Sequence, residues 1–208
     1  MTMARRERQG LVEAMRSAGP EAPTLCAEWT VRDLAAHVVV RERRPDAAPG
    51  ILLKPFAGYL DRVQTKVASK PFPALLEQVR TGPPWWSPLR PVDAVVNLSE
   101  MFVHHEDVRR AAPRWQPREL TAADEDTLWS QVRRMASMSY RKAPVTVALR
   151  THDGRRVVAR SASGGVVVTL TGKPSELLLH AFGRDEVLLE TSGDADAVRA
   201  VLDLDRSV

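Results

Sequence analysis

The segment Glu100-Met101-Phe102-Val103-His104 places a carboxylate and an imidazole four residues apart. On a helix, side chains at this spacing lie on one face with neighbouring β-carbons, so these two could share one divalent cation. Glu and His pairs at this spacing are also ordinary on solvated helix faces. The pair alone is therefore weak evidence for a metal site, and a third ligand is needed from elsewhere in the chain.

His37 is the candidate for that third ligand because of the residues around it. It lies in the run Leu34–Val40, which is too apolar for a solvated imidazole. A lone histidine there is best explained as a core residue that is hydrogen-bonded to a backbone or carboxylate group. Together with Glu100 and His104 on a second helix, it predicts a site of two histidines and one carboxylate. Three protein ligands leave one position open, as in catalytic zinc sites, although the same donors accept nickel, iron or manganese.

Three more polar residues are candidates for supporting these ligands through hydrogen bonds: Asp33, His105 and Asp107. Asp33 precedes His37 by four residues and could hold its imidazole, but a helix-capping role is favoured. Asp107 follows His104 by three residues, and an ordinary helix charge is the favoured interpretation. His105 lies about 100° around the helix from His104, so one metal is not expected to take both. We interpret it as a supporting or surface residue.

The remaining reactive side chains form no recognisable site. Cys26 is the single cysteine, which excludes an internal disulfide framework. It precedes the cap residue Thr30, where a helix N-terminus could activate a thiol, yet a small buried filler is favoured over a nucleophile. Trp85 and Trp86 lie in a proline-rich loop and are interpreted as packing residues or as walls of a pocket.

Helices are expected to carry these side chains. Thr30 and Asp33 form the pattern of a capping box, and Pro45 ends the helix that follows. Apolar residues that recur with a period of about 3.6 predict further helices over 5–18, 58–68, 73–80, 91–112 and 121–140. Five or six helices joined by proline-rich loops describe a helix bundle over residues 1–142.

After Pro144 the apolar period changes to two residues, which indicates strands. Turn residues separate three such segments, over 145–150, 157–159 and 166–171, and predict a three-stranded antiparallel meander. A helix over 173–182, a strand over 187–190 and a helix over 194–202 follow. The expected fold class is therefore α+β, with a small C-terminal domain over residues 143–208.

Composition restricts the partners. The chain has 208 residues, of which 44% are hydrophobic, so it can bury a core. No apolar run is long enough for a membrane span and the first residues are charged, so we expect a cytoplasmic protein. The net charge is +4, but acidic residues interrupt most basic stretches. A solvated basic surface is favoured over a nucleic-acid partner.

Two segments resemble the DinB-like superfamily: Cys26–His37, which contains the motif Trp-Thr-x-x-Asp-Leu-x-x-His, and Glu100–Arg110, which contains Glu-x-x-x-His. Within it, the chain is similar to the actinobacterial branch that includes mycothiol-dependent maleylpyruvate isomerase. The resemblance implies a four-helix metal-binding bundle, zinc at the His and Glu positions named above, and a C-terminal domain similar to sterol carrier proteins. The segment 38–51 departs from the isomerase and points to an uncharacterised metal-binding subfamily.

The resemblance implies a function in which the metal ionises a low-molecular-weight thiol of the mycothiol type. The protein would then be a thiol-dependent transferase or isomerase that acts on a small electrophile. The alternative is a non-catalytic, metal-stabilised protein that binds a small molecule or a lipid. Both a monomer and a homodimer are compatible with the sequence.

Overall fold

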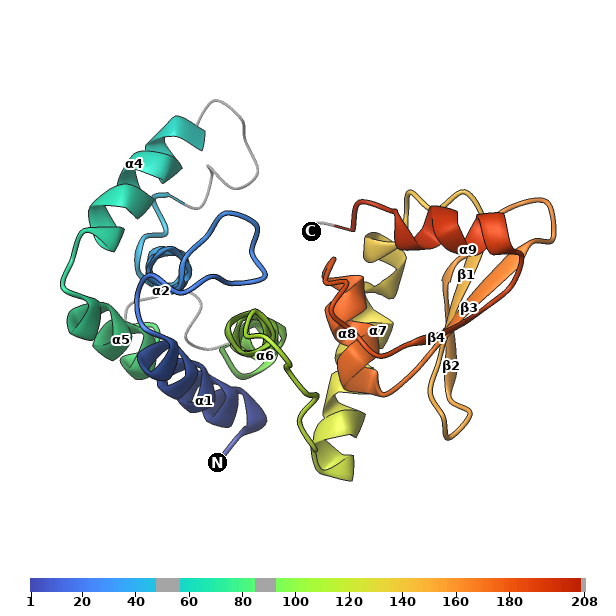
Figure 1. Cartoon of the computed structure of the whole chain (residues 1–208), viewed down its shortest axis with the longest axis horizontal. Coiled ribbons are helices and arrows are strands. Elements are labelled where there is room, and N and C mark those ends of the chain that lie inside the picture. Colours follow the sequence, from blue (N-terminus) through green and yellow to red (C-terminus); the bar gives the residue numbers. More distant parts are fainter. Residues whose placement is uncertain (48–56, 85–92, 207–208) are drawn as a thin grey trace. The chain divides into compact units, whose positions relative to one another are not determined.

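A computed structural model describes residues 1–47, 57–84 and 93–206 (Figure 1). The chain forms two compact units, Met1–Pro117 and Arg118–Val208. Within the described residues the first unit is helical, and the second combines helices with a four-stranded sheet. The predicted α+β class with an N-terminal helical domain is confirmed.

The first unit is built from amphipathic helices around one core. Its described helices are α1 (Met3–Ala18), α2 (Val31–Arg43), α4 (Ala57–Ala68), α5 (Phe72–Thr81) and α6 (Asp93–Arg110). Helix α1 packs against α6 and α5, and α2 packs against α4 and α5. The shared core includes the fully buried side chains of Leu11, Met15, Leu34, Leu75 and Met101. Burial of side chains of this size contributes about 1.5–3 kcal/mol each, which holds the helices in place.

A complete capping box fixes the start of α2. The Thr30 side chain accepts a hydrogen bond from the Asp33 amide at 3.3 Å, and the Asp33 carboxylate accepts one from the Thr30 amide at 3.0 Å. The predicted cap is therefore confirmed. Because it sets the first turn, it also sets which face of α2 carries His37.

A close contact between α1 and α6 fixes the rotation of α6. Gly10 lies where a β-carbon would overlap the His105 ring, so the two helices approach closely at this point. The His105 ring is buried, and its Nδ1 lies 2.8 Å from Glu7 Oε2 of α1. Because His105 points toward α1, the neighbouring His104 is turned toward a different part of the unit.

The second unit contains α7 (Ala122–Ser139), β1 (Thr146–Arg150), β2 (Arg156–Arg160), β3 (Val167–Thr171), α8 (Pro174–Ala181), β4 (Glu190–Ser192) and α9 (Ala195–Leu202). The strand order is β2-β1-β3-β4. Strand β3 pairs in parallel with β1, from Thr146 opposite Val167 to Arg150 opposite Thr171. The expected antiparallel meander is therefore wrong, because β3 lies beside β1 and not beside β2.

Thr146 explains how β3 reaches that position. Its hydroxyl makes hydrogen bonds with the Ala162 amide and carbonyl, and its amide donates to the Val166 carbonyl at 3.1 Å. The short link after β2 is thereby held across the beginning of β1. Turn residues and alternation predict strands, but they do not say on which side of β1 the third strand pairs.

Helix α7 belongs to the second unit, whereas the expected boundary lay after residue 142. The Glu125 carboxylate of α7 accepts hydrogen bonds from the amide and hydroxyl of Ser175, at the start of α8, at 2.9 Å each. Arg155 Nη1 donates to Asp126 Oδ1 at 2.7 Å. These contacts attach α7 to α8 and to the β1–β2 hairpin, while its apolar period alone says only that one face is buried.

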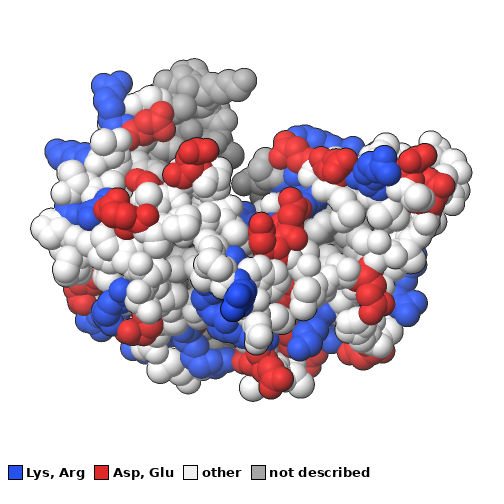
Figure 2. Space-filling model, viewed as in Figure 1, with Lys and Arg blue, Asp and Glu red and all other residues white. Residues whose placement is uncertain are grey.

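Two features of the described residues bear on partners. On the face shown in Figure 2, Lys and Arg side chains alternate with Asp and Glu, and no broad field of one sign appears. Every described helix is too short or too polar to cross a lipid bilayer.

Candidate metal centre

The three predicted ligands lie together in the first unit. His37 comes from the middle of α2, and Glu100 and His104 come from one face of α6. One donor atom from each lies within 4.8 Å of the other two. The rings of His37 and His104 meet edge to face, with centroids 5.5 Å apart, and His104 Nε2 lies 3.3 Å from Glu100 Oε2. Two helices distant in sequence therefore bring two imidazoles and one carboxylate to a common point.

The hydrogen bonding of His104 fits a metal ligand. Its Nδ1 lies 2.9 Å from Asp107 Oδ2, while its buried Nε2 makes no hydrogen bond with the described residues and lies 3.3 Å from Glu100 Oε2. With the proton of a neutral ring held on Nδ1 by Asp107, the Nε2 lone pair is available to a cation. Two nitrogen donors and one oxygen donor form a set that zinc accepts.

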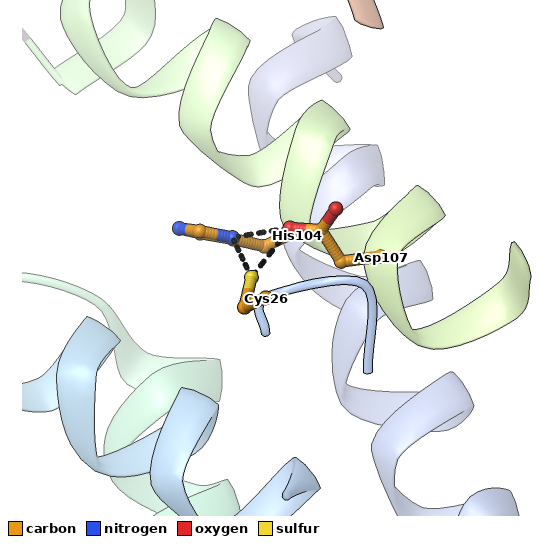
Figure 3. A group of neighbouring side chains, drawn as sticks. All are labelled: Cys26, His104 and Asp107. Atoms are coloured by element: carbon orange, nitrogen blue, oxygen red, sulfur yellow. Dashed lines mark hydrogen bonds and ion pairs between the residues drawn. The ribbon is translucent and has the colours of Figure 1, made fainter. Parts of the chain in front are cut away.

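Asp107 and Cys26 support His104 from the side of Nδ1 (Figure 3). The Cys26 thiol donates to Asp107 Oδ2 at 3.0 Å and lies 4.0 Å from His104 Nδ1. The Leu25 amide donates to the Asp107 carbonyl at 3.1 Å, which attaches the loop before α2 to α6. The sequence favoured a buried filler for Cys26 and an ordinary helix charge for Asp107. In the structure these two side chains contact one another, and each also contacts His104.

Cys26, His104 and Asp107 form a second group whose donor atoms lie within 4.8 Å of one another. In this group the thiol, the carboxylate and Nδ1 already make hydrogen bonds with one another. In the group of His37, Glu100 and His104, the Nε2 atom of His104 makes no hydrogen bond with any residue that the structure describes. The group on the Nε2 side is therefore the better candidate for holding a cation.

Burial and neighbouring charges set the protonation of the candidate ligands. Burial, aided by the charge of His104, lowers the pKa of His37 to about 4, so its ring is neutral at pH 7. Burial raises the pKa of Glu100, but the contact with His104 and the charges of His104 and Arg41 outweigh it and bring that pKa to about 2. Both groups are thus in the form that binds a cation.

His104 differs, because its hydrogen-bond partners favour the charged ring. Burial lowers its pKa, but the contacts with Asp107, Cys26 and Glu100 outweigh burial and raise the pKa well above its usual value. A cation that binds at Nε2 therefore has to displace a proton.

Two further residues lie next to the centre, although the sequence analysis did not predict them as part of it. Arg41 Nη2 lies 3.6 Å from Glu100 Oε1, and the Trp29 ring lies 4.9 Å from the His37 ring at a tilt of 45°. Arg41 follows His37 by one helical turn, so the period of α2 was the signal that could have found it. Trp29 lies in the loop before α2, whose path the period does not predict.

The other candidates have different roles. The Asp33 carboxylate belongs to the cap of α2, and among the described contacts it makes none with His37. His105 contacts Glu7 and packs on α1, away from the candidate ligands. The tryptophan pair 85–86 lies outside the described residues.

Comparison with known families supports the relationship inferred from the motifs. Residues 2–50 match the family model described as "Mycothiol maleylpyruvate isomerase N-terminal domain". The match spans α1 and α2 and includes His37, while Glu100 and His104 lie beyond it. The search of curated proteins and the search of solved structures gave no match. Residues 2–50 are therefore similar to the N-terminal domain of this isomerase family, in agreement with the resemblance inferred from the motif that ends at His37.

Proposed function

We propose that the protein holds one divalent cation, zinc in the first instance, between His37, Glu100 and His104. With it, the protein binds a low-molecular-weight thiol of the mycothiol type and uses that thiol in a transferase or isomerase reaction on a small electrophile. The observation that carries the proposal is the meeting of three donor groups within 4.8 Å, one of which is a buried nitrogen that makes no hydrogen bond with the described part of the chain. The matched family adds the thiol.

The residues around the cation have separate tasks in this proposal. A zinc ion with an open position supplies positive charge that favours the thiolate form of a thiol. His37 is available because its ring is neutral, and Glu100 because it is ionised. Asp107 keeps the remaining proton of His104 on Nδ1 and so directs Nε2 to the centre.

Metal content tests the site. The purified protein is expected to carry about one equivalent of zinc or of another divalent cation. His37→Ala removes one ligand and should lose most of it, whereas His152→Ala changes an exposed turn residue of the second unit and should keep it. Elemental analysis of the three proteins after identical purification gives the answer. The proposed site would be contradicted if His37→Ala retained all of the metal. It would also be contradicted if the parent protein held no cation after dialysis against zinc.

Turnover tests the reaction. The zinc-loaded protein, mixed with mycothiol and an activated alkene, should consume the alkene faster than thiol and alkene alone, and His37→Ala should not. A chelator series that lowers the melting temperature, with no turnover at any zinc level, would instead support the non-catalytic alternative.

A further inference from the structure

We infer that the loop 24–29 positions both candidate histidine ligands of the metal centre. On one side, Cys26 acts on His104 through a carboxylate of α6. On the other side, Trp29 acts on the ring of His37 by direct contact. The inference rests on the proposed function, because it concerns residues that orient the ligands of a cation. It makes Cys26 and Trp29 positioning residues that stand outside the set of ligands.

Hydrogen bonds within the loop hold its two contact residues relative to one another. The Thr24 hydroxyl donates to the Trp29 carbonyl at 2.8 Å, and the Cys26 amide donates to the same hydroxyl at 3.1 Å. The Trp29 amide donates to the Cys26 carbonyl at 3.0 Å. Because Thr24 is buried, these bonds lie in a region of low dielectric, where a hydrogen bond is stronger than in water. The loop therefore has one shape before any cation binds.

Two hydrogen bonds attach the loop to Asp107 of α6. The Leu25 amide donates to the Asp107 carbonyl at 3.1 Å, and the Cys26 thiol donates to Asp107 Oδ2 at 3.0 Å (Figure 3). The same carboxylate oxygen lies 2.9 Å from His104 Nδ1. One oxygen thus meets the thiol and the imidazole together, and these two partners fix its direction. Without the thiol, the carboxylate could turn more freely, and the ring of His104 would turn with it.

The ring of His37 is oriented by packing. Among the described residues no side chain gives it the kind of hydrogen bond that Asp107 gives His104, and its ring contacts are with Trp29 and His104. The Trp29 ring lies 4.9 Å from it at a tilt of 45°, within the distances at which aromatic rings attract one another. Trp29 therefore limits the rotation of the His37 ring and keeps it directed at the centre.

The position of Cys26 suits a hydrogen-bond donor better than a metal ligand. Its sulfur lies 4.0 Å from His104 Nδ1 and donates to the carboxylate on that edge of the ring. Glu100 lies at the other ring nitrogen, with Oε2 3.3 Å from Nε2. A cation held by Glu100 and Nε2 is therefore on the opposite edge of the ring from the thiol. The thiol reaches that cation through Asp107 and the ring alone.

Zinc dissociation constants of the full chain, from competition with a chromophoric chelator, test both contacts. Cys26→Ala should weaken zinc binding about twofold to tenfold, the effect of one typical hydrogen bond. Cys26→Ser keeps a donor for the same carboxylate and should stay within about twofold of the parent. Trp29→Leu should weaken binding about twofold to tenfold through the loss of the ring contact, and Trp29→Phe should restore most of it.

Absorption of the cobalt-loaded parent tests whether the thiol is a ligand. A thiolate bound to cobalt gives an intense charge-transfer band in the near ultraviolet, and the parent should lack this band. Ala27→Gly is the control, since Ala27 is exposed in the same loop and has a φ of 49°, which glycine adopts readily. It should bind zinc as the parent does.

The outcomes separate this inference from the proposed function. If Cys26→Ala or Trp29→Leu binds zinc as tightly as the parent, that residue has no positioning role. A thiolate band in the parent, no rescue by Cys26→Ser, or an equal loss of affinity in Ala27→Gly would also overturn the inference, while the proposed function would stand. If the parent binds neither zinc nor cobalt, the proposed function and the inference fail together.

Discussion

A single carboxylate decides how His104 is presented. Asp107 Oδ2 lies 2.9 Å from the ring Nδ1 and accepts a hydrogen bond from the Cys26 thiol at 3.0 Å. The orientation of the ring therefore depends on a carboxylate that a second residue holds in place. Such partners of metal-binding histidines fix the tautomer and raise the basicity of the ring. The affinity of the centre for a cation should therefore depend on Asp107, although Asp107 is not among the proposed ligands.

Asp107→Asn tests this dependence. The amide has nearly the same shape, but it lacks the charge that favours a proton on Nδ1, so zinc affinity should fall by about tenfold to a hundredfold. Competition against a chromophoric chelator measures the constant. Asp61→Asn on an exposed turn of α4 is the matched control and should keep the parent's affinity. An Asp107→Asn protein with unchanged affinity would mean that the ring is oriented without this carboxylate.

At the scale of the elements, the contact between α1 and α6 determines which residues of α6 face the centre. His105 fills the space above Gly10 and contacts Glu7, both on α1. Since successive residues on a helix point about 100° apart, this contact also fixes the direction of His104. A residue with a β-carbon at position 10 would overlap the buried His105 ring, so either the ring or α6 would have to shift.

Two glycine substitutions separate packing from helix propensity. Gly10→Ala adds a methyl group against the buried His105 ring and should destabilise the protein by about 1–3 kcal/mol. Gly58→Ala, in α4, meets nothing within 4 Å and should be neutral or stabilising by up to about 1 kcal/mol. Urea unfolding followed by circular dichroism compares the two. Equal stability of the two variants would show that α1 and α6 tolerate separation at this point.

At the scale of the whole molecule, each unit contains a histidine whose ring is neutral at pH 7. Burial lowers the pKa of His37 to about 4 in the first unit. In the second unit, burial and the nearby charge of Arg206 lower the pKa of His180 to about 3, and its Nδ1 contacts the buried Tyr140 hydroxyl at 2.6 Å. In the unfolded chain both rings take up a proton near the ordinary histidine pKa of about 6.5, whereas in the folded units they do so only at lower pH.

The stability of the protein should therefore fall as the pH falls from about 6.5 toward about 3. In this window the unfolded state binds a proton that the folded state lacks at His180, so this residue contributes a slope of about 1.4 kcal/mol per pH unit. His180→Gln keeps an acceptor for Tyr140 and removes the titration, so its slope should be smaller. The measurement is denaturant unfolding at several pH values between 7 and 4.

The exposed His152 supplies the control, since His152→Ala should follow the parent's pH dependence. If His180→Gln and the parent lose stability equally between pH 6 and pH 4, the buried ring is protonated in the folded state and the lowered pKa is contradicted.

Local interactions explain which features were predictable from the sequence. The cap of α2 involves Thr30 and Asp33, three residues apart, and the pairing of Glu100 with His104 follows from the rise of one helical turn. Helix periods, strand alternation and turn residues act over similarly short distances. The residues alone therefore predict the α+β class, most of the helices and the shared face of the two candidate ligands on α6.

Tertiary structure decided what depends on residues far apart in the chain. The hydrogen bonds of Thr146 with the link after β2 decide the parallel pairing of β3, and the bond between Glu125 and Ser175 decides that α7 belongs with the sheet. Contacts across more than fifty residues also bring Cys26 to Asp107 and Arg41 to Glu100. No local pattern carries this information, because each side chain meets a partner whose position is known only once the cores have packed.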